Sequence, residues 1–215
     1  MGLKVMAPDV NKSDIAWTGT GDEVRVGLMA VHGLSEKFLR NLVIQREKRI
    51  FTSEYDFFSR TKPSDNEARA LIHSGAIDGI AGNPNRTVLL WLWASFQHQK
   101  RGKGVGTLFE TPLPIAPDLP RADRISQLRK EYRVLGFLCN NHPLEFLQVQ
   151  RLQRNHGGKA LVKMKDLPSR VGQRVIVAGW LLTGKLISTK TGEVMEFLTF
   201  EDETSIVETT FFPNV

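Results

Sequence analysis

Hydrophobic residues recur at helical spacing through much of the chain. Phe38, Leu39, Leu42 and Val43 fall on one face of a helix that Ser35 is placed to cap. Further apolar helical patterns follow at 53–58, 64–74, 83–96, 124–135 and 144–155. Three of these begin with a capping signal: Ser53, the capping-box spacing that starts at Ser64, and Asn83 with Pro84 at the first helical position. The pattern predicts a series of short amphipathic helices.

Two glycine turns interrupt this helical region. Residues 24–28 form a strand pattern, and Gly33 makes a tight turn before the helix that Ser35 caps. The helix after Ser64 ends at Ser74-Gly75, and a second helical segment follows. Glycine can adopt backbone angles that other residues avoid and can let a phosphate approach backbone N–H groups. A helix N-terminus beside the turn also favours an anion, so we interpret these turns as DNA-backbone contacts, with plain helix-joining turns as the alternative.

The periodicity changes from helical to alternating at about residue 159. Residues 174–182, 194–200 and 206–212 are predicted to be strands, joined by turns at 189–193 and 201–205. Gly179 lies inside the long first strand, where a glycine allows the kink of a small barrel. The pattern suits the opening strands of an OB-fold, a barrel of five strands that often binds single-stranded nucleic acid. The fold class expected is therefore α+β with several domains.

A composition change marks a linker between Gln99 and Pro120, which is rich in glycine and proline. It contains one isolated apolar peptide, Thr107-Leu108-Phe109, which could dock into a partner or anchor the linker to its own domain. We therefore divide the chain into a helical region at 1–82, a helical and Gly/Pro-rich connecting region at 83–158, and part of a β-barrel at 159–215. Trp91 and Trp93 are expected in the core rather than stacked on bases.

The chain of 215 residues carries 29 lysines and arginines against 23 acidic residues, a net charge of +6 with a pI near 9.6, which suits a polyanionic partner. Its single cysteine, Cys139, excludes an internal disulfide or a cysteine-based zinc site and is expected to be a buried thiol. The adjacent acids Glu201, Asp202 and Glu203 are interpreted as solvated turn residues, not metal ligands. With no apolar run long enough for a membrane span and no leader pattern, we expect a cytoplasmic protein.

Several short segments, in this order and spacing, resemble the last third of the bacterial DNA polymerase III alpha subunit family, which includes an error-prone paralogue. The segments are APDVNKS at 7–13, VRVGL at 24–28 with HGL at 32–34, ALIHSGAID at 70–78, EYRVLGF at 131–137, HPL at 142–144, FLTFEDET at 197–204 and FFP at 211–213. Each segment alone is weak, but their order is specific. The resemblance covers essentially the whole chain.

This resemblance implies a different role for each region of the chain. Residues up to about 80 would be the end of the fingers region, with a tandem helix-hairpin-helix unit on duplex DNA. The final strands would belong to an OB domain that holds single-stranded template. The linker would be the place of a sliding-clamp-binding peptide, although Val105 stands where the family usually has glutamine.

Catalysis is implied for the parent protein only, a DNA-directed DNA polymerase and thus a nucleotidyltransferase. The family's palm domain, with the carboxylates that hold two Mg²⁺ ions, lies upstream of the segments matched here. This chain alone would bind DNA without copying it, and we expect no catalytic residue, no metal site and no cofactor in it.

The candidate sites follow from these arguments. The residues expected to contact DNA are Val31, His32, Gly33, Leu34, Ser35, Lys37, Arg40, Arg69, Gly75, Ala76, Lys185 and Lys190. Thr107, Leu108 and Phe109 are the candidate partner-binding peptide for the clamp. The first hypothesis is the DNA-binding portion of a polymerase for replication or translesion synthesis. The second is an interaction module for a clamp, a loader or a mutagenesis subunit, and a third is an independent repair protein.

Overall fold

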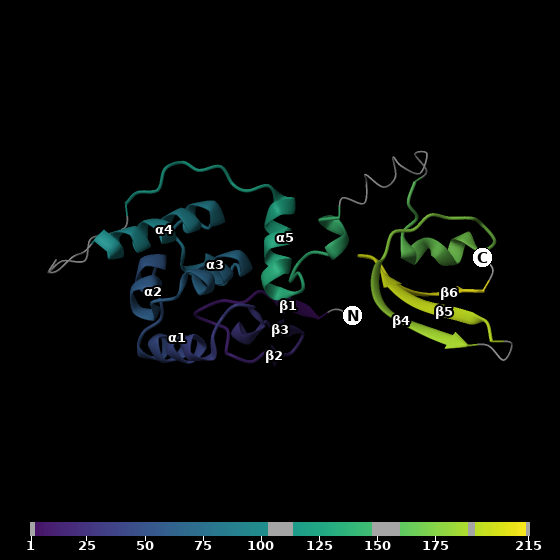
Figure 1. The fold of residues 1–215 in the computed structure, drawn as a ribbon, viewed down its shortest axis with the longest axis horizontal. Helices are drawn as coiled ribbons and strands as arrows, with labels where there is room; N and C mark the ends of the chain where they lie inside the picture. Colours follow the sequence, from purple (N-terminus) through teal and green to yellow (C-terminus); the bar gives the residue numbers. More distant parts are fainter. Residues whose placement is uncertain (1–2, 103–113, 148–159, 189–191, 214–215) are drawn as a thin grey trace. The chain divides into compact units, whose positions relative to one another are not determined.

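The computed structural model describes residues 3–102, 114–147, 160–188 and 192–213 and shows an α+β protein (Figure 1). Packing divides the chain into two compact units, Met1–Asn140 and Asn141–Val215. Among the described residues, the first unit holds a small sheet and five α-helices, and the second holds a separate sheet. The division at residues 82 and 158 stays a prediction.

The first unit begins with three short strands, β1 (Lys4–Met6), β2 (Thr18–Thr20) and β3 (Glu23–Arg25). β3 lies in the middle, parallel to β1 and antiparallel to β2. The strand pattern predicted at 24–28 thus ends earlier than expected, and the 3-10 turn η1 (Leu28–Ala30) follows it. The small sheet leads the chain into the first glycine turn.

In the described part of this unit, five α-helices and a second 3-10 turn follow the small sheet. They are α1 (Glu36–Lys48), α2 (Glu54–Thr61), α3 (Asp65–Ser74), η2 (Asp78–Ile80), α4 (Arg86–Gly102) and α5 (Arg124–Leu135). The predicted caps are confirmed: Ser35 and Ser53 accept hydrogen bonds from Phe38 and Asp56, and Ser64 forms a full capping box with Glu67.

The start of α4 differs from the prediction. The helix begins at Arg86, and Asn85 takes the capping place expected for Asn83. The Asn85 Oδ1 accepts from the Thr87 N–H at 3.1 Å, and the Asn85 carbonyl accepts from the Leu89 N–H at 3.0 Å. Asn83 and Asn85 are both residues that favour the N-cap position, so the sequence is compatible with two starts for α4. In the structure the helix begins after Asn85.

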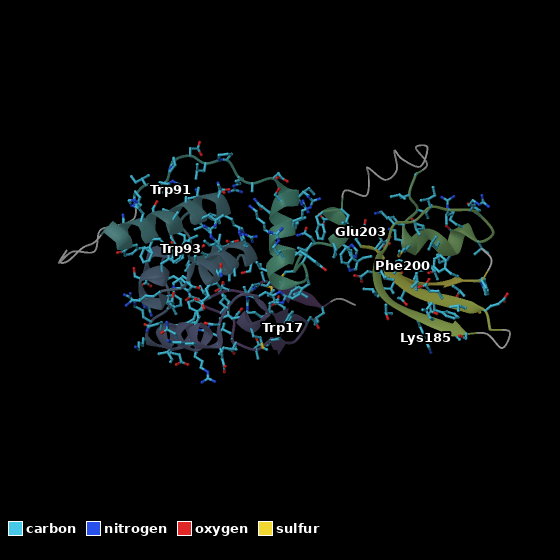
Figure 2. All side chains as sticks on the ribbon, in the orientation of Figure 1. Trp17, Trp91, Trp93, Lys185, Phe200 and Glu203 are labelled. Carbon is cyan, nitrogen blue, oxygen red and sulfur yellow. The ribbon has the colours of Figure 1, made fainter. Side chains whose placement is uncertain are left out.

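The core of the first unit is a cluster of aromatic and aliphatic side chains from α1 to α4. Trp93 is buried and packs against Phe58 and Phe96, with ring centroids 4.9 and 5.8 Å away. Its indole N–H donates to Asp65 Oδ1 at 2.8 Å. Trp91, labelled with Trp93 in Figure 2, is half-buried against the same cluster, so the prediction that both belong to the core is confirmed.

The predicted linker is shorter than expected at its start, because α4 continues through residues 99–102. At its other end, Ala116 and Leu119 pack against the core, and the Leu119 carbonyl accepts from Asn85 Nδ2 at 2.8 Å. These apolar residues anchor the segment that returns to α5. The peptide 107–109 lies outside the described residues.

The second unit contains an antiparallel sheet in the order β4-β5-β6, with β4 at Trp180–Ser188, β5 at Val194–Glu201 and β6 at Ile206–Phe211. Two 3-10 segments precede it, η3 (Pro143–Glu145) and η4 (Met164–Arg170). The turn predicted between β5 and β6 is confirmed. A helix was predicted at 144–155, of which the structure describes residues 144–147. These residues begin in the 3-10 turn η3, and residues 148–155 lie outside the described ranges.

The first strand of this sheet starts later than predicted. Residues 174–179 form no strand, and the Ile176 carbonyl instead accepts from the Val162 N–H at 2.9 Å. Gly179 lies so close to its neighbours that a Cβ there would be 2.5 Å from Met164 Cε and 2.7 Å from Phe200 Cβ. Gly179 therefore lets Met164 and Phe200 approach the backbone closely just before β4 begins. The register of the β4-β5 pairing shifts further along, between Leu181 and Thr183.

The interpretation of Asp202 as a solvated turn residue is wrong. Its side chain is buried, and Oδ1 accepts from the N–H groups of Thr204 and Ser205 at 2.7 and 3.0 Å. Oδ2 accepts from the Met164 N–H at 2.8 Å, which joins the turn to η4. The carboxylate thus satisfies backbone donors, and in the described ranges no group of three or more acidic, histidine or cysteine side chains could hold a metal ion.

Candidate nucleic-acid interface

The first glycine turn leaves two backbone donors unused. Gly33 has a φ of +94°, and its N–H and that of Leu34 have no hydrogen-bond partner in the part of the chain that the structure describes. Both lie just before α1, where the helix dipole favours an anion. His32, by contrast, donates its N–H to the Val134 carbonyl at 2.7 Å. Gly33 and Leu34 are therefore the donors that could bind a phosphate oxygen.

The turn rests on an apolar support. Val31 is 2% exposed and forms a small buried cluster with Ala70 of α3 and Leu135 of α5. A Cβ on Gly33 would lie 3.9 Å from the Ala70 Cβ. Val31 thus holds the turn from beneath, and its own N–H is bonded to the Leu28 carbonyl at 3.1 Å.

Ser35 is bonded internally as well. Its hydroxyl donates to Glu67 Oε1 at 2.7 Å, and its N–H donates to the same oxygen at 3.3 Å. The other oxygen of Glu67 accepts from the N–H and hydroxyl of Ser64, both at 2.8 Å. Burial acts to raise the pKa of Glu67, but these hydrogen bonds outweigh it and hold the pKa below the ordinary value.

Three candidate cations surround this turn on exposed helix positions. Lys37 has no ion-pair partner within the described ranges. Arg40 pairs with Glu36 at 2.5 Å and Arg69 with Asp65 at 2.7 Å, both as exposed pairs one helical turn apart. Such surface pairs contribute little to stability, so each arginine can exchange its carboxylate for a phosphate.

The second glycine turn has a different construction. Gly75 has a φ of +79° and donates its N–H to the Ile72 carbonyl at 3.2 Å, while Ala76 donates to the Leu71 carbonyl at 3.0 Å. Both donors close the C-terminal end of α3, and Ala76 is buried. In the structure, both N–H groups of this turn are thus already used by the carbonyls at the end of α3.

Arg86 fills the space beside Gly75. Its Nη1 donates to the His73 carbonyl at 2.8 Å, and its Nη2 lies 3.2 Å from Asp78 Oδ2. Glu131 Oε2 of α5 is 3.6 Å from Nη1. Burial raises the pKa of both carboxyls, and Arg86 opposes that shift. A Cβ on Gly75 would be 2.4 Å from Arg86 Nη2, so this glycine makes room for the guanidinium.

The remaining predicted sites belong to the second unit or lie outside the described residues. Lys185 is exposed on β4 in the second unit, opposite Phe197 (Figure 2). Lys190 and the peptide Thr107-Leu108-Phe109 lie outside the described residues. Cys139 is half-buried, less than the buried thiol predicted, and burial together with Glu131 raises the pKa of its thiol to about 11, which disfavours the thiolate needed for a nucleophile.

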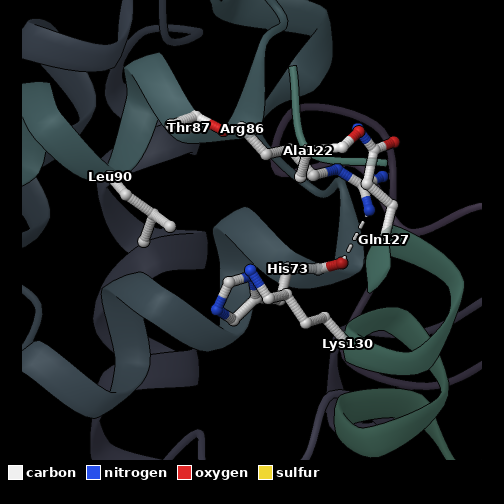
Figure 3. A pocket seen from close by; sticks show the side chains of 7 residues that line it. All are labelled: His73, Arg86, Thr87, Leu90, Ala122, Gln127 and Lys130. Carbon is white, nitrogen blue, oxygen red and sulfur yellow. Dashed lines mark hydrogen bonds between the residues drawn. The ribbon is translucent and has the colours of Figure 1, made fainter. Parts of the chain in front are cut away.

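The first unit also contains a positively charged hollow that was not predicted from the sequence. Its lining side chains come from α3, the start of α4, α5 and the residue Ala122, as Figure 3 shows: His73, Arg86, Thr87, Leu90, Ala122, Gln127 and Lys130. The basic residues of α5 were visible in the sequence, but the packing of α3 against α5 was not.

No helix in the described ranges is long and apolar enough to span a membrane.

Comparisons with known proteins agree with this geometry. Residues 2–88 match the family model described as the helix-hairpin-helix motif. Over 99% of its length the chain is 29% identical to the DNA polymerase III subunit alpha of Bacillus subtilis, and over 88% it is 28% identical to the error-prone DNA polymerase of Xanthomonas campestris. The chain is related to these polymerases. It spans 19% and 16% of their lengths.

The DNA polymerase III subunit alpha of Aquifex aeolicus is also similar, at 27% identity over the whole chain and 18% of its own length. The resemblance inferred from short segments is thereby confirmed. The helix-hairpin-helix match covers both glycine turns, including Gly33 and Gly75.

Proposed function

We propose that this chain is the DNA-binding portion of a DNA polymerase of the DNA polymerase III alpha or error-prone type, and that it holds the duplex backbone without reading sequence. The observation that carries the proposal is the pair of free N–H groups at Gly33 and Leu34 before α1. Backbone donors and a helix N-terminus are well suited to a phosphate oxygen.

The binding mode would be electrostatic. Lys37 and Arg40 lie on the first turns of α1 and would neutralise neighbouring phosphates, and Arg69 would do so from α3. Each neutralised phosphate makes the logarithm of the binding constant fall by about 0.9 per logarithmic unit of salt. The grip should therefore weaken steeply with salt and depend little on base sequence.

The activity of the whole protein is part of the same proposal. By its resemblance, the parent would transfer nucleotides with carboxylates and Mg²⁺ ions located outside this chain. The chain itself would hold DNA and contribute no cofactor. The sheet β4-β5-β6, with Lys185 exposed on it, would be part of an OB domain for single-stranded template in replication or translesion synthesis.

One feature favours a second function, the docking of a protein partner such as a sliding clamp. Leu186 and Phe211 flank Glu196 on one face of the β4-β5-β6 sheet and are 68% and 48% exposed. Large apolar side chains exposed together often mark an interaction surface. The DNA measurement below separates the two functions.

The test is fluorescence anisotropy with duplex, single-stranded and primer-template DNA over a salt series. Gly33→Asp places a carboxylate at the free donors and should abolish most duplex binding. Gly82→Asp is a matched control, because Gly82 is exposed and a side chain there meets nothing within 4 Å. The doubly substituted Lys37→Gln/Arg40→Gln keeps the backbone intact and should lower the salt slope by about two units.

Loss of duplex binding in Gly33→Asp alone, with the control unchanged, would support the proposal if circular dichroism shows that the variant is folded. Duplex binding that survives both Gly33→Asp and the double substitution would refute the role of this turn. If no DNA form binds the wild type at low salt, the partner-docking function is favoured instead.

A further inference from the structure

The hollow of Figure 3 carries positive charge that its surroundings do not neutralise. In the described part of the chain, neither the His73 ring nor the Lys130 ammonium has a hydrogen-bond or ion-pair partner. Arg69 and Arg133 add two more cations near the ring. A charged group without a partner in a partly buried position is costly unless a ligand supplies the opposite charge.

The nearby carboxylates are already engaged. Asp78 and Glu131 both face Arg86, with their closest oxygens 3.2 and 3.6 Å from its guanidinium nitrogens. Asp65 pairs with Arg69 and also accepts from the Trp93 indole. Within the described residues, none of these three carboxylates forms an ion pair with Lys130. The excess charge of the hollow is therefore positive.

Burial and the neighbouring cations act together on the His73 imidazole. Burial, followed by Lys130, Arg86, Arg69 and Arg133, lowers its pKa from 6.5 to about 4. The ring is therefore neutral at pH 7 and can donate a hydrogen bond, and it would gain a proton readily if an anion entered. The Thr87 hydroxyl, on the first turn of α4, faces the same hollow.

We propose that this hollow, lined by His73, Thr87 and Lys130, is a second phosphate-binding site that holds a DNA backbone phosphate beside the one held at the first glycine turn. Lys130 would pair with the phosphate charge, and the His73 ring and Thr87 hydroxyl would donate to its oxygens. This proposal rests on the proposed function and adds a contact that neither glycine turn provides.

The position of the hollow supports a shared DNA strand. Gly33 lies over Ala70, and His73 follows Ala70 by three residues, about 4.5 Å along α3. On α5 the Val134 carbonyl accepts from His32, and Lys130 precedes Val134 by about one helical turn. Both helices thus run from the first turn to the hollow, and we expect one DNA backbone to contact both places.

The test uses the histidines as separate reporters in one NMR experiment. His32 lies in the first turn, His73 lines the hollow, and His142 belongs to the second unit and serves as an internal control. Titration of the ring Cε1–H signals over pH 4.5–8 with a short duplex should raise the pKa of His73 by about one unit or more, because an adjacent anion favours the protonated ring. Inorganic phosphate is run as a parallel arm.

Lys130→Gln removes the unpaired ammonium and is compared with Lys48→Gln, the same change at the far end of α1. Loss of one phosphate contact should weaken duplex binding about five- to tenfold at 0.1 M salt and lower the salt slope by about one. It should also remove the DNA-induced change at His73. Urea unfolding of both variants checks that they remain folded.

The outcomes separate the two proposals. If DNA perturbs His32 but not His73, and Lys130→Gln binds like Lys48→Gln, the second site is refuted while the first turn stands. If inorganic phosphate moves His73 and DNA moves neither histidine, the hollow binds free phosphate, and both DNA assignments are refuted. Perturbation of both histidines by DNA, with the Lys130→Gln effect, supports the site.

Discussion

The Glu67 carboxylate of α3 accepts both the hydroxyl and the N–H of Ser35, at 2.7 and 3.3 Å. Ser35 is the N-cap of α1, and Glu67 is also the acidic member of the capping box of α3. One buried carboxylate thereby joins the first turns of two helices. Since the free donors of Gly33 and Leu34 directly precede Ser35, the same bridge fixes the candidate phosphate site.

Glu67→Gln tests this bridge. An amide has one acceptor oxygen instead of two, so one helix start loses its bonds, and the free energy of unfolding should fall by about 1–3 kcal/mol at pH 7. The pKa of Glu67 is held below its ordinary 4.5, so its contribution is present above pH 4.5 and is lost as pH falls through the lower folded value. Urea unfolding measures both effects. Glu47→Gln, an exposed change on α1, should leave stability within about 0.5 kcal/mol.

Arg86→Gln should destabilise the first unit by about 2–4 kcal/mol at pH 7, because Asp78 and Glu131 lose their counter-charge. Burial already raises the pKa of both carboxyls, and the loss of Arg86 should raise it further. The variant should therefore recover part of its deficit on acidification to pH 5. Equal deficits at pH 7 and pH 5 in urea unfolding would contradict this interpretation. Arg121→Gln, an exposed change before α5, is the control.

Asp202→Asn addresses the second unit. The carboxylate accepts from Met164, Thr204 and Ser205, and these bonds outweigh the effect of burial and keep its pKa below the ordinary 3.8. An amide cannot accept at both oxygen positions, so we expect a loss of about 1–3 kcal/mol and faster amide exchange around β6. Hydrogen exchange followed by mass spectrometry would show it. Asp166 on η4 is exposed, and its side chain forms no hydrogen bond with the described residues, so Asp166→Asn should exchange like the wild type.

The local elements could be predicted because their signals are local. Ser35, Ser53 and Ser64 cap helices where the sequence places them, since each competes only with its own backbone. The starts of α4 and β4 were misplaced where two signals compete: Asn83 against Asn85, and an alternating pattern at 174–179 against the close packing of Gly179 on Phe200.

The residues of the candidate site also fall into two groups, those that a local sequence signal predicts and those that depend on hydrogen bonds or packing. Gly33 was found because a glycine before a capped helix is a sequence signal, and its neighbours Lys37 and Arg40 come with it. Gly75 and Ala76 carry a similar signal, but whether their N–H groups are free depends on hydrogen bonds within the end of α3. The hollow around His73 and Lys130 forms only because α3 packs on α5. The hydrophobic periodicity of the sequence does not predict which helices pack together.

The stability of the first unit should fall on mild acidification because of His73. Its folded pKa of about 4 lies below the unfolded value of 6.5, so between these values the unfolded chain binds a proton that the folded chain does not. His73 therefore does not lower the free energy of unfolding above pH 6.5. Its destabilising effect grows as the pH falls from 6.5 toward 4. After allowance for solvent screening of this half-buried ring, we expect about 1–2 kcal/mol between pH 7 and pH 4.5.

His73→Gln should flatten this part of the pH profile. The groups that face the ring, Lys130, Arg86, Arg69 and Arg133, stay charged throughout, and Asp78 and Glu131 titrate in wild type and variant alike, so the difference between the two profiles isolates His73. Urea unfolding at pH 7, 6, 5 and 4.5 measures it, with His98→Gln on the exposed side of α4 as the control. A His73→Gln profile that runs parallel to the wild type would mean that the cations do not act on this ring. The charge argument for the hollow would then fail together with this prediction, whereas the donors of Gly33 and Leu34 would be unaffected, because their availability depends on backbone geometry alone.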